Sequence, residues 1–252
     1  MSAARLELRG IAKAFGDLSV LGDVSISVGK GEFVSILGPS GSGKSTIFKL
    51  LTGALRPDAG AMLFDGTPLH PDRRPFAFMP QRDALMDWRR IIDNTTLGLE
   101  VQGIGRAAAR RRVAPLFTEF GLSGFEHHYP AQLSGGMRQR AALLRTVVQD
   151  KDMLLLDEPF GALDALTRAD RQRWLETMGN RHGWTTLLVP HDVREAVLLS
   201  DRIYVLSARP GRVIAEVAVP LPRPRRTGAA VAAIETGILD LLLSAPTKGL
   251  ER

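Results

Sequence analysis

The stretch Gly38-Pro39-Ser40-Gly41-Ser42-Gly43-Lys44-Ser45-Thr46 decides the fold of this chain. It has the pattern G-x-x-x-x-G-K-[ST], whose glycines let successive backbone N–H groups turn inward around an anion. The run before it, Phe33–Leu37, is continuously apolar, which predicts a strand buried on both faces, and residues 45–53 have a helical pattern. Strand, glycine-rich loop and helix in this order predict a nucleoside-triphosphate site at a helix N-terminus.

Two side chains in this loop have predicted roles of their own. Lys44 supplies a positive charge for the β- and γ-phosphates, and Ser45 offers a hydroxyl to Mg²⁺. A chance glycine-rich turn is the alternative, and the register of Lys44 and Ser45 between strand and helix argues against it. The loop by itself does not separate a kinase, a GTPase, a helicase and a transport motor.

Two adjacent acids end the next buried strand, which we expect over residues 153–156. Because side chains alternate along a strand, Asp157 and Glu158 leave its end in different directions. We expect Asp157 to orient the Mg²⁺ shell and Glu158 to face the attacking water, as hydrolysis of a γ-phosphate requires. The alternative is that the two acids only form a polar, exposed strand end. The phosphate loop earlier in the chain argues against this alternative.

Four further motifs, together with the two above, resemble those of the ATP-binding-cassette (ABC) ATPases, in that family's order and from about Arg5 to Arg212. The signature-like run is Leu133-Ser134-Gly135-Gly136-Met137-Arg138-Gln139-Arg140. The others are Gln81 after Phe78-Met79-Pro80, Gly161-Ala162-Leu163-Asp164, and His191-Asp192. The combination is far more specific than any one of its members.

The resemblance implies a role for each of these residues. Gln81 and His191 join Glu158 as catalytic residues, with Gln81 also at Mg²⁺ and His191 at the γ-phosphate. Ser134, Gly135, Gly136 and Asp164 contact ATP, and Phe15 lies where the family often stacks a ring on adenine. In the family, the signature of one subunit closes over the nucleotide of the other, so a second copy of this chain is implied. Ser134-Gly135-Gly136 opening a helix agrees with a second phosphate half-site.

One branch of the family is resembled more specifically. The run Gln81–Arg89 with Asp93-Asn94, and the run Ser207–Arg212, are similar to importer ATPases for nitrate, sulfonates and taurine. This implies integral membrane permease subunits as partners, a solute-binding protein acting indirectly, and a place on the cytoplasmic face of the cell membrane. Leu85, Met86 and Trp88 either form an exposed groove for the permease or pack internally, and we favour the groove.

Other functions stay open on the sequence. A soluble cassette acting on DNA or the ribosome is disfavoured because the chain has one cassette and no sustained heptads, so we expect no nucleic-acid partner. A small-molecule phosphotransferase leaves the Ser-Gly-Gly loop and His191 without a role. An exporter is opposed by the segment after Gln81 and by the terminal segment. Pro190 departs from the family, which usually has threonine before this histidine.

The pattern of the whole chain predicts an α/β fold: a P-loop NTPase core with a parallel sheet, an N-terminal antiparallel β part and an inserted α-helical subdomain. We expect an ATPase domain over residues 1–222, with the helical insertion at about 83–150. Residues 223–252 are expected to be a C-terminal extension with one helix, docked on its own domain. The expected helices are 45–53, 94–102, 106–120, 136–149, 166–179, 193–199 and 228–243, and the expected strands are 6–8, 24–28, 33–37, 153–156, 185–189 and 203–207.

Composition limits the alternatives further. Of the 252 residues, 44% are hydrophobic and none is cysteine, which excludes disulfides and thiolate metal sites. No apolar run approaches the roughly 20 residues of a membrane-spanning helix. The net charge is +6, with dense runs at Arg110-Arg111-Arg112 and Arg223-Pro224-Arg225-Arg226. No aromatics are interleaved with them, so we expect a solvated helix face and loop.

Overall fold

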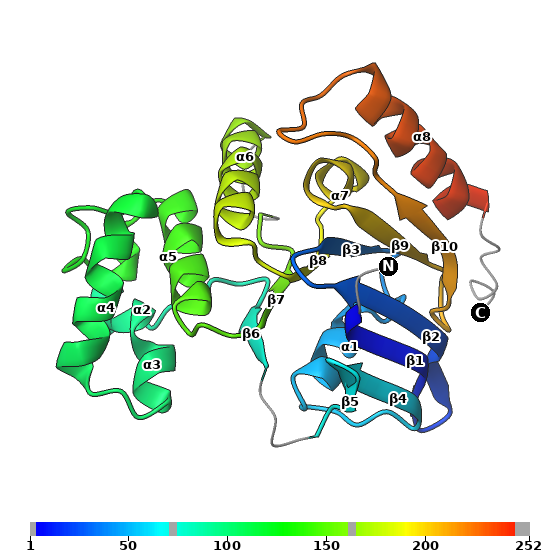
Figure 1. The fold of residues 1–252 in the computed structure, drawn as a ribbon, viewed down its shortest axis with the longest axis horizontal. Helices are drawn as coiled ribbons and strands as arrows, with labels where there is room; N and C mark the ends of the chain where they lie inside the picture. Colours follow the sequence, from blue (N-terminus) through cyan, green and yellow to red (C-terminus); the bar gives the residue numbers. More distant parts are fainter. Residues whose placement is uncertain (1–3, 71–74, 161–164, 245–252) are drawn as a thin grey trace.

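Two β-sheets and a group of helices make up the chain (Figure 1). The structure is a computed structural model that describes residues 4–70, 75–160 and 165–244. One sheet has four antiparallel strands in the order β2-β1-β4-β5, and the other has six in the order β10-β9-β3-β8-β7-β6. Within the six-stranded sheet β9, β3, β8, β7 and β6 are parallel, and β10 runs antiparallel to β9.

The strands are β1 Ala4–Phe15, β2 Leu18–Gly29, β3 Phe33–Leu37, β4 Ala59–Phe64, β5 Thr67–Pro68, β6 Phe76–Met79, β7 Met153–Asp157, β8 Thr186–Val189, β9 Arg202–Leu206 and β10 Val213–Ala218. The α-helices are α1 Lys44–Leu51, α2 Ile91–Thr95, α3 Leu97–Val101, α4 Arg106–Glu119, α5 Gly135–Val147, α6 Ala165–His182, α7 Val193–Leu199 and α8 Ala229–Ser244. A short 3₁₀ turn, Pro130–Gln132, precedes α5.

Strand β3 shows why the parallel sheet is buried on both faces. All five of its residues are buried. Val34 and Ile36 pack with the antiparallel sheet and α1 on one face, whereas Phe33 packs on the other face with Leu175 and Met178 of α6. This alternation follows from the two-residue period of a strand. The continuous apolar run in the sequence therefore encodes a strand between two layers, as expected.

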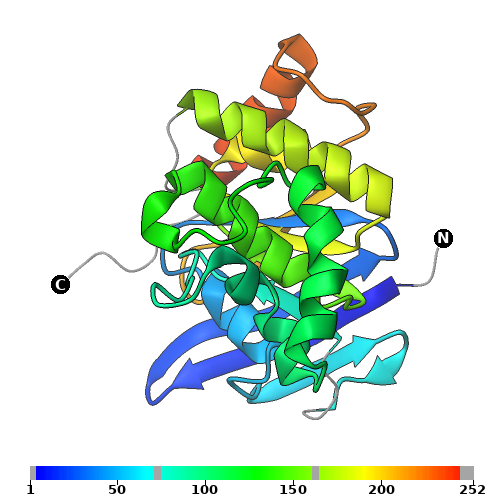
Figure 2. The same cartoon turned by 90° about the vertical axis from the view of Figure 1, so that its left-hand side faces the viewer.

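The helical insertion lies to one side of the sheets (Figure 1), and in Figure 2 it stands in front of them. Helices α2 to α5 share one core with β6 and β7, which includes Ile91, Leu99, Phe117 and Leu144. The single helix expected over 94–102 is wrong: α2 and α3 meet at Thr96. The Thr96 hydroxyl donates to the Asp93 carbonyl and to Glu100 Oε1, at 3.3 and 2.7 Å, and such side-chain bonds compete with a continuous helix.

Several strands were not expected from the sequence, namely β4, β5, β6 and β10. In β4 and β10 few residues are fully buried, so the apolar signal is weak. The first hairpin is also longer than expected. Strands β1 and β2 have 12 residues each and include several register shifts, which hide the regular alternation that marks a strand.

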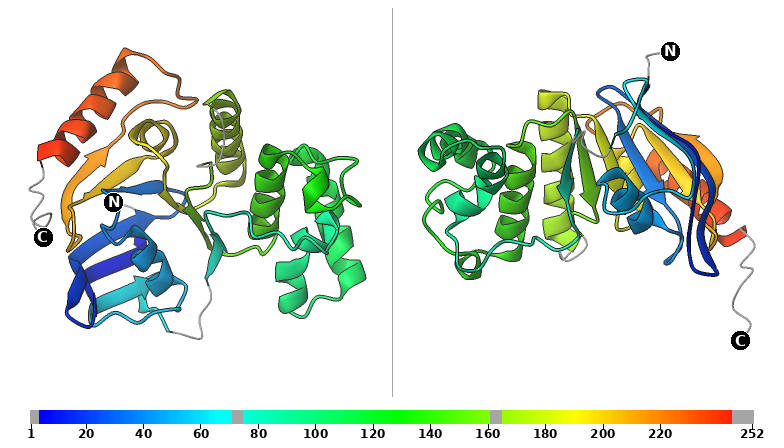
Figure 3. Two further views of the ribbon diagram at one scale, coloured as in Figure 1. Left: turned by 180° about the vertical axis from the view of Figure 1, so that it is seen from behind. Right: turned by 90° about the horizontal axis from the view of Figure 1, so that it is seen from below.

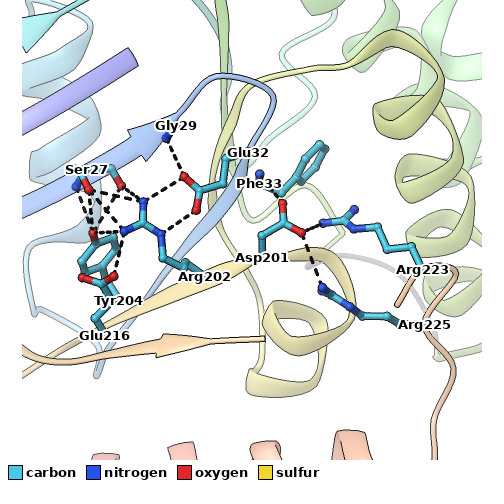
Figure 4. Close-up of polar contacts among 10 residues, drawn as sticks. All are labelled: Ser27, Gly29, Glu32, Phe33, Asp201, Arg202, Tyr204, Glu216, Arg223 and Arg225. Carbon is cyan, nitrogen blue, oxygen red and sulfur yellow. Dashed lines mark hydrogen bonds and ion pairs between the residues drawn. The ribbon is translucent and has the colours of Figure 1, made fainter. Parts of the chain in front are cut away.

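The C-terminal arginine run is not a solvated loop, contrary to the expectation. Arg225 is 6% exposed and donates to the carbonyls of Leu221, Val197, Ser200 and Val219. Arg223 donates to the Leu199 carbonyl and to Asp201 Oδ1, both within 2.8 Å. Figure 4 shows both arginines converging on Asp201. These carbonyls lie at the ends of α7 and β10, where they lack partners in regular structure, and the arginines satisfy them.

A second polar network joins the two sheets (Figure 4). Arg202 on β9 donates to both oxygens of Glu32, at 2.6 and 2.9 Å, and to the carbonyl of Ser27 on β2. Glu32 also accepts the N–H of Gly29 at 2.6 Å, in the turn after β2. The network fixes the antiparallel sheet against the parallel one.

Helix α8 packs across α7, as expected for a terminal helix docked on its own domain (Figure 3). Val231 and Ile238 are buried, at 4% and 1% exposed, in a core shared with Ala196 and Val197 of α7. None of the helices in the described ranges combines the length and the apolar character that crossing a bilayer requires.

Candidate active site

The residues expected to act on a nucleotide follow the carboxyl ends of neighbouring parallel strands. Gly38 follows β3, Glu158 follows β7, and His191 follows β8. Gln81 comes shortly after β6, which pairs with β7 at the sheet edge. In open α/β sheets this edge is where ligands bind, because the loops that leave it converge there.

The phosphate loop borders a cleft of about 480 Å³. The cleft is lined by Glu158, Pro190 and His191 and by most of the phosphate loop, namely Gly38, Ser40, Gly41, Gly43, Lys44, Ser45 and Thr46. Gly43 has φ 95°, and a Cβ there would overlap the Leu21 side chain, so only glycine fits. Lys44 begins α1, one residue before the expected start of the helix, and its Nζ donates to the carbonyls of Gly38 and Pro39 at 2.7 and 2.9 Å.

Glu158 is the point on which the other catalytic candidates converge. Gln81 Nε2 donates to Glu158 Oε2 at 2.7 Å, and His191 Nδ1 lies 4.0 Å from the same oxygen. Glu158 has φ 43°, in the left-handed region that a non-glycine residue adopts at an energetic cost. Its N–H extends the sheet by bonding the Val189 carbonyl at 2.8 Å, which holds this backbone in place. The three residues come from separate segments and meet at one carboxylate.

Charges in the cleft influence one another. Burial lowers the pKa of Lys44, and the nearby Glu158 and Asp157 oppose that shift. Burial also raises the pKa of Asp157, to which Glu158 adds, whereas Lys44 lowers it. A lysine and two carboxyls thus share a partly desolvated space, in which an added phosphate or divalent cation experiences strong electrostatic interactions.

The donor set fits Mg²⁺. This ion prefers oxygen ligands and keeps several waters, so it takes few side chains besides the substrate phosphates. The Ser45 hydroxyl, the Asp157 carboxylate and the Gln81 amide oxygen are all hard donors. Within the described ranges, no group of three or more histidines, cysteines or acids has a geometry suited to a metal ion, and a phosphate-bridged Mg²⁺ needs none.

The remaining predicted ligands lie apart from this cleft or beyond the described residues. Ser134 is exposed and caps α5, its Oγ accepting the Met137 N–H at 3.3 Å. It and the following Gly135 and Gly136 are not among the described residues that line the cleft with Lys44. Phe15, at the end of β1, is 47% exposed, with Lys13 Nζ 5.6 Å from the centre of its ring. Asp164 lies outside the described residues.

Arg209 is a cleft residue for which sequence analysis proposed no role. It comes from the turn between β9 and β10, and its Nε donates to the Gly41 carbonyl at 3.4 Å. The neighbouring Gly211 bonds both Gly22 and Val20 of β2, which anchors this turn beside the phosphate loop. Its position just beyond a parallel strand is the signal that would have found it.

A larger hollow of about 670 Å³ lies between α1 and strands β4 to β6. Its lining is mainly apolar and includes Leu50, Phe76 and Phe78. No acid and no phosphate-loop residue is found among the described residues that line it. The chemistry belongs to the smaller, polar cleft.

The exposed apolar groove expected after Gln81 is only partly present. Leu85 is 9% exposed and belongs to the core of the helical insertion, so it offers little surface to a partner. Trp88 is 78% exposed. Side chains from the insertion hold the loop that contains both residues. Arg145 donates to the carbonyls of Asp83 and Ala84, and the Asn94 amide donates to the carbonyls of Met86 and Arg89. Tertiary packing decides which of these apolar residues face solvent, and the local sequence does not encode that choice.

Comparison with known proteins places these features in context. The family model described as ABC transporter matches residues 21–161. "Aliphatic sulfonates import ATP-binding protein SsuB 2" from Pseudomonas aeruginosa is 43% identical over 242 residues, covering 96% of this chain and 85% of the relative. The protein named SsuB from Pectobacterium atrosepticum is 42% identical, covering 96% and 88%.

Solved structures agree in fold. The dimeric structure of MJ0796, described as a bacterial ABC transporter cassette, has a TM-score of 0.74 at 29% identity and covers 86% of this chain and 100% of its own. MJ0796 has also been solved as a post-hydrolysis dimer bound to ADP and Pi, with a TM-score of 0.72 at 27% identity and coverages of 86% and 100%. CbiO1 from Clostridium perfringens, part of an ABC transporter complex, has a TM-score of 0.75 at 25% identity, with coverages of 86% and 89%.

Proposed function

Because this chain belongs to the ABC transporter ATPases, we propose that it is the ATP-hydrolysing subunit of an importer, driving uptake of a small solute through a separate membrane permease. The observation that carries the proposal is the convergence of Gln81 and His191 on Glu158 beside the phosphate loop. The solute class rests on the relatives, which are named for import of aliphatic sulfonates. We propose a sulfonate, which includes taurine, or a related small solute such as nitrate.

The site residues divide the reaction among them. The backbone N–H groups of residues 38–46 and the Lys44 ammonium hold the β- and γ-phosphates. Glu158 accepts a proton from the attacking water. The water oxygen then bonds the γ-phosphorus as the bond between that phosphorus and ADP breaks. Gln81 orients the Glu158 carboxylate, and His191 contacts the γ-phosphate. Mg²⁺, held by Ser45, Asp157 and Gln81, supplies charge neutralisation when bound.

The second phosphate half-site requires a second copy of the chain. Ser134, Gly135 and Gly136 open α5, a 13-residue helix whose N-terminus attracts anions, yet they do not line the cleft of their own subunit. In the proposed dimer this helix closes over the nucleotide of the partner, with Asp164 at the same interface and Phe15 stacked on adenine. Two equivalent sites then follow from two-fold symmetry.

The proposed partners place the chain at the cytoplasmic face of the cell membrane, bound to permease subunits and served indirectly by a solute-binding protein. We assign residues 1–222 to the ATPase domain, with the helical insertion at about 83–150, and residues 223–252 to a C-terminal extension. The exposed Trp88, next to the Gln81 loop, is the contact proposed for the permease.

Substitution of Glu158 by glutamine tests the hydrolytic assignment. The amide cannot accept the proton from water, so we expect steady-state ATP turnover to fall by more than about a hundredfold, with nucleotide affinity nearly unchanged. The variant should also accumulate as an ATP-bound dimer on size exclusion. Glu235→Gln, the same chemical change on α8, is the matched control and should keep full turnover. Full turnover in Glu158→Gln would remove this residue from the role.

Transport itself is tested in membrane vesicles that contain the permease. Uptake of a radiolabelled alkanesulfonate should require ATP and this chain, and it should be lost with Glu158→Gln. ATP-dependent efflux, or uptake that is indifferent to the chain, would contradict the importer assignment.

A further inference from the structure

A buried carboxyl lies directly behind the loop that carries His191. Glu195, in the first turn of α7, is 0% exposed. Its Oε2 accepts the backbone N–H of His191 at 3.2 Å. Its own N–H donates to Oδ1 of Asp192, the residue that caps α7, at 2.7 Å. Glu195 is therefore hydrogen-bonded to two consecutive residues, His191 and Asp192, of the turn that leads from β8 into α7.

This bond has particular weight because of Pro190. Proline has no N–H, so the first donor after β8 belongs to His191. The connection from β8 to α7 is only three residues long, and it is fixed at one end by the sheet and at the other by the helix. The hydrogen bond from the His191 N–H to Glu195 spans the turn. It fixes the position of the His191 backbone, and with it the direction of the imidazole.

The surroundings of Glu195 disfavour a negative charge. Its pKa is raised to about 8, chiefly by burial and also by the charge of Asp192, although the His191 N–H, Arg168 and Gln172 act in the opposite direction. Oε1 of the carboxyl is buried and has no hydrogen-bond partner among the described residues. Strand β3 beneath α7 has no titratable side chain, and on the outer face Arg194 pairs with Glu235 of α8 at 3.3 Å.

We propose that the buried Glu195 is a positioning residue that fixes the His191 backbone and so holds the imidazole beside Glu158. This inference rests on the proposed role of His191 in hydrolysis. An uncharged acid can stay buried and still accept the His191 N–H, which a carboxylate can do only by bringing its charge into a desolvated place.

A dependence on pH follows from this arrangement. Below about pH 8 the neutral acid keeps the turn in place. Above it, ionisation favours conformations in which the carboxylate is hydrated, which requires α7 and its preceding loop to move away. The imidazole then leaves its position next to Glu158, and turnover falls although nucleotide is still bound.

The test compares pH profiles of ATP turnover, from pH 6.5 to 9.5, for the wild-type chain, Glu195→Gln, Glu195→Ala and the control Glu235→Gln. We expect wild-type kcat to fall by about threefold or more above pH 8, with KM little changed. Glutamine imitates the neutral acid, so Glu195→Gln should keep the neutral-pH rate within about twofold and lose the alkaline decline. Glu235→Gln should behave like the wild type. Glu195→Ala should lose about tenfold in kcat at pH 7.

Three results would overturn the proposal: no alkaline decline in the wild type, the same decline in Glu195→Gln, or full turnover in Glu195→Ala. If circular dichroism shows Glu195→Ala unfolded, the profile of Glu195→Gln decides alone. His191→Ala separates the two levels of inference. Full turnover in His191→Ala would remove His191 from the proposed function, and the role of Glu195 with it. Loss of turnover in His191→Ala, together with wild-type pH profiles in both Glu195 variants, would refute the positioning role alone.

Discussion

Pro190 shows how a single residue can depart from a family pattern and still fit the site. It follows directly after Val189, the last residue of β8, and its ring lines the nucleotide cleft. A proline at a strand end removes no ladder hydrogen bond that the strand needs. The Val189 carbonyl still accepts the N–H of Glu158, so the connection between the two catalytic segments is intact.

We therefore expect Pro190→Thr to change ATP turnover by less than about tenfold, which corresponds to about 1.4 kcal/mol in the barrier. Threonine restores an N–H and the freedom of φ, while the bond from His191 to Glu195 continues to fix the turn. The measurement is steady-state ATPase activity at saturating ATP. A hundredfold change in either direction would show that the proline itself aims His191.

At the scale of elements, the C-terminal segment is attached by buried polar contacts as well as by apolar packing. Arg225 reaches the end of α7 and the strand end of β10, and α8 then folds back over α7. The extended, proline-rich segment that carries it has no regular structure of its own. Its place is decided by one guanidinium that satisfies several carbonyls at once.

Replacement of Arg225 by alanine should lower the free energy of unfolding by about 2–4 kcal/mol, because it leaves buried carbonyls without donors. Arg226→Ala is the matched control, since Arg226 is exposed in the same run, and it should cost less than about 0.5 kcal/mol. Urea unfolding followed by circular dichroism measures both. Equal effects for the two substitutions would mean that the buried bonds contribute nothing.

The loop after Gln81 is a second element whose surface matters. Arg138 and Arg145 hold it from α5, Arg138 pairing with Asp83 at 3.1 Å. The helix that carries the signature motif is thus joined to the loop that follows Gln81. A permease bound at Trp88 would have a direct mechanical connection to both.

Trp88→Ala should leave the basal ATPase rate of the isolated chain within about twofold, because Trp88 is not among the described residues that line the cleft. Stimulation of that rate by the permease should fall by at least about fivefold, as expected when an exposed aromatic anchor is lost. Val101→Ala, at an 81% exposed apolar residue on α3, is the control. Normal stimulation in Trp88→Ala would place the permease contact elsewhere.

At the scale of the whole molecule, the two phosphate half-sites of one chain lie on different parts of the fold. Lys44 belongs to the sheet-based core, and Ser134 begins a helix of the insertion (Figure 1). The dimeric MJ0796 cassette shows that a fold of this kind pairs with itself. Because ATP would then contact both copies, its hydrolysis would weaken the pair, which is how bond cleavage can produce motion.

Mixing two inactive variants tests this arrangement. Lys44→Ala destroys one half-site and Ser134→Arg the other, so each homodimer lacks both complete sites. A mixed dimer keeps one complete site, and we expect roughly a quarter of wild-type turnover at equal concentrations. Native mass spectrometry confirms that mixing has occurred. Absence of activity in proven mixed dimers would contradict either the shared sites or their independence.

Much of the site is readable in the sequence because the chemistry depends on local order. A buried strand, a glycine-rich loop and a helix must be consecutive, so the motif at residues 38–46 predicts its own surroundings. The acids at 157–158 are equally local. Strands β4 and β10 were missed because they are only partly buried, so their apolar pattern is weak.

The sequence by itself determined the family and the order of its motifs and predicted the nucleotide site, because each motif consists of residues adjacent in the chain. Only the tertiary structure decided which side chains lie together across long separations. Arg225 reads as a solvated charge and is buried, and Leu85 reads as a surface residue and is core. Glu195, which the sequence analysis did not single out, lies behind His191. Burial and polar satisfaction depend on the packing of remote segments, which no local pattern records.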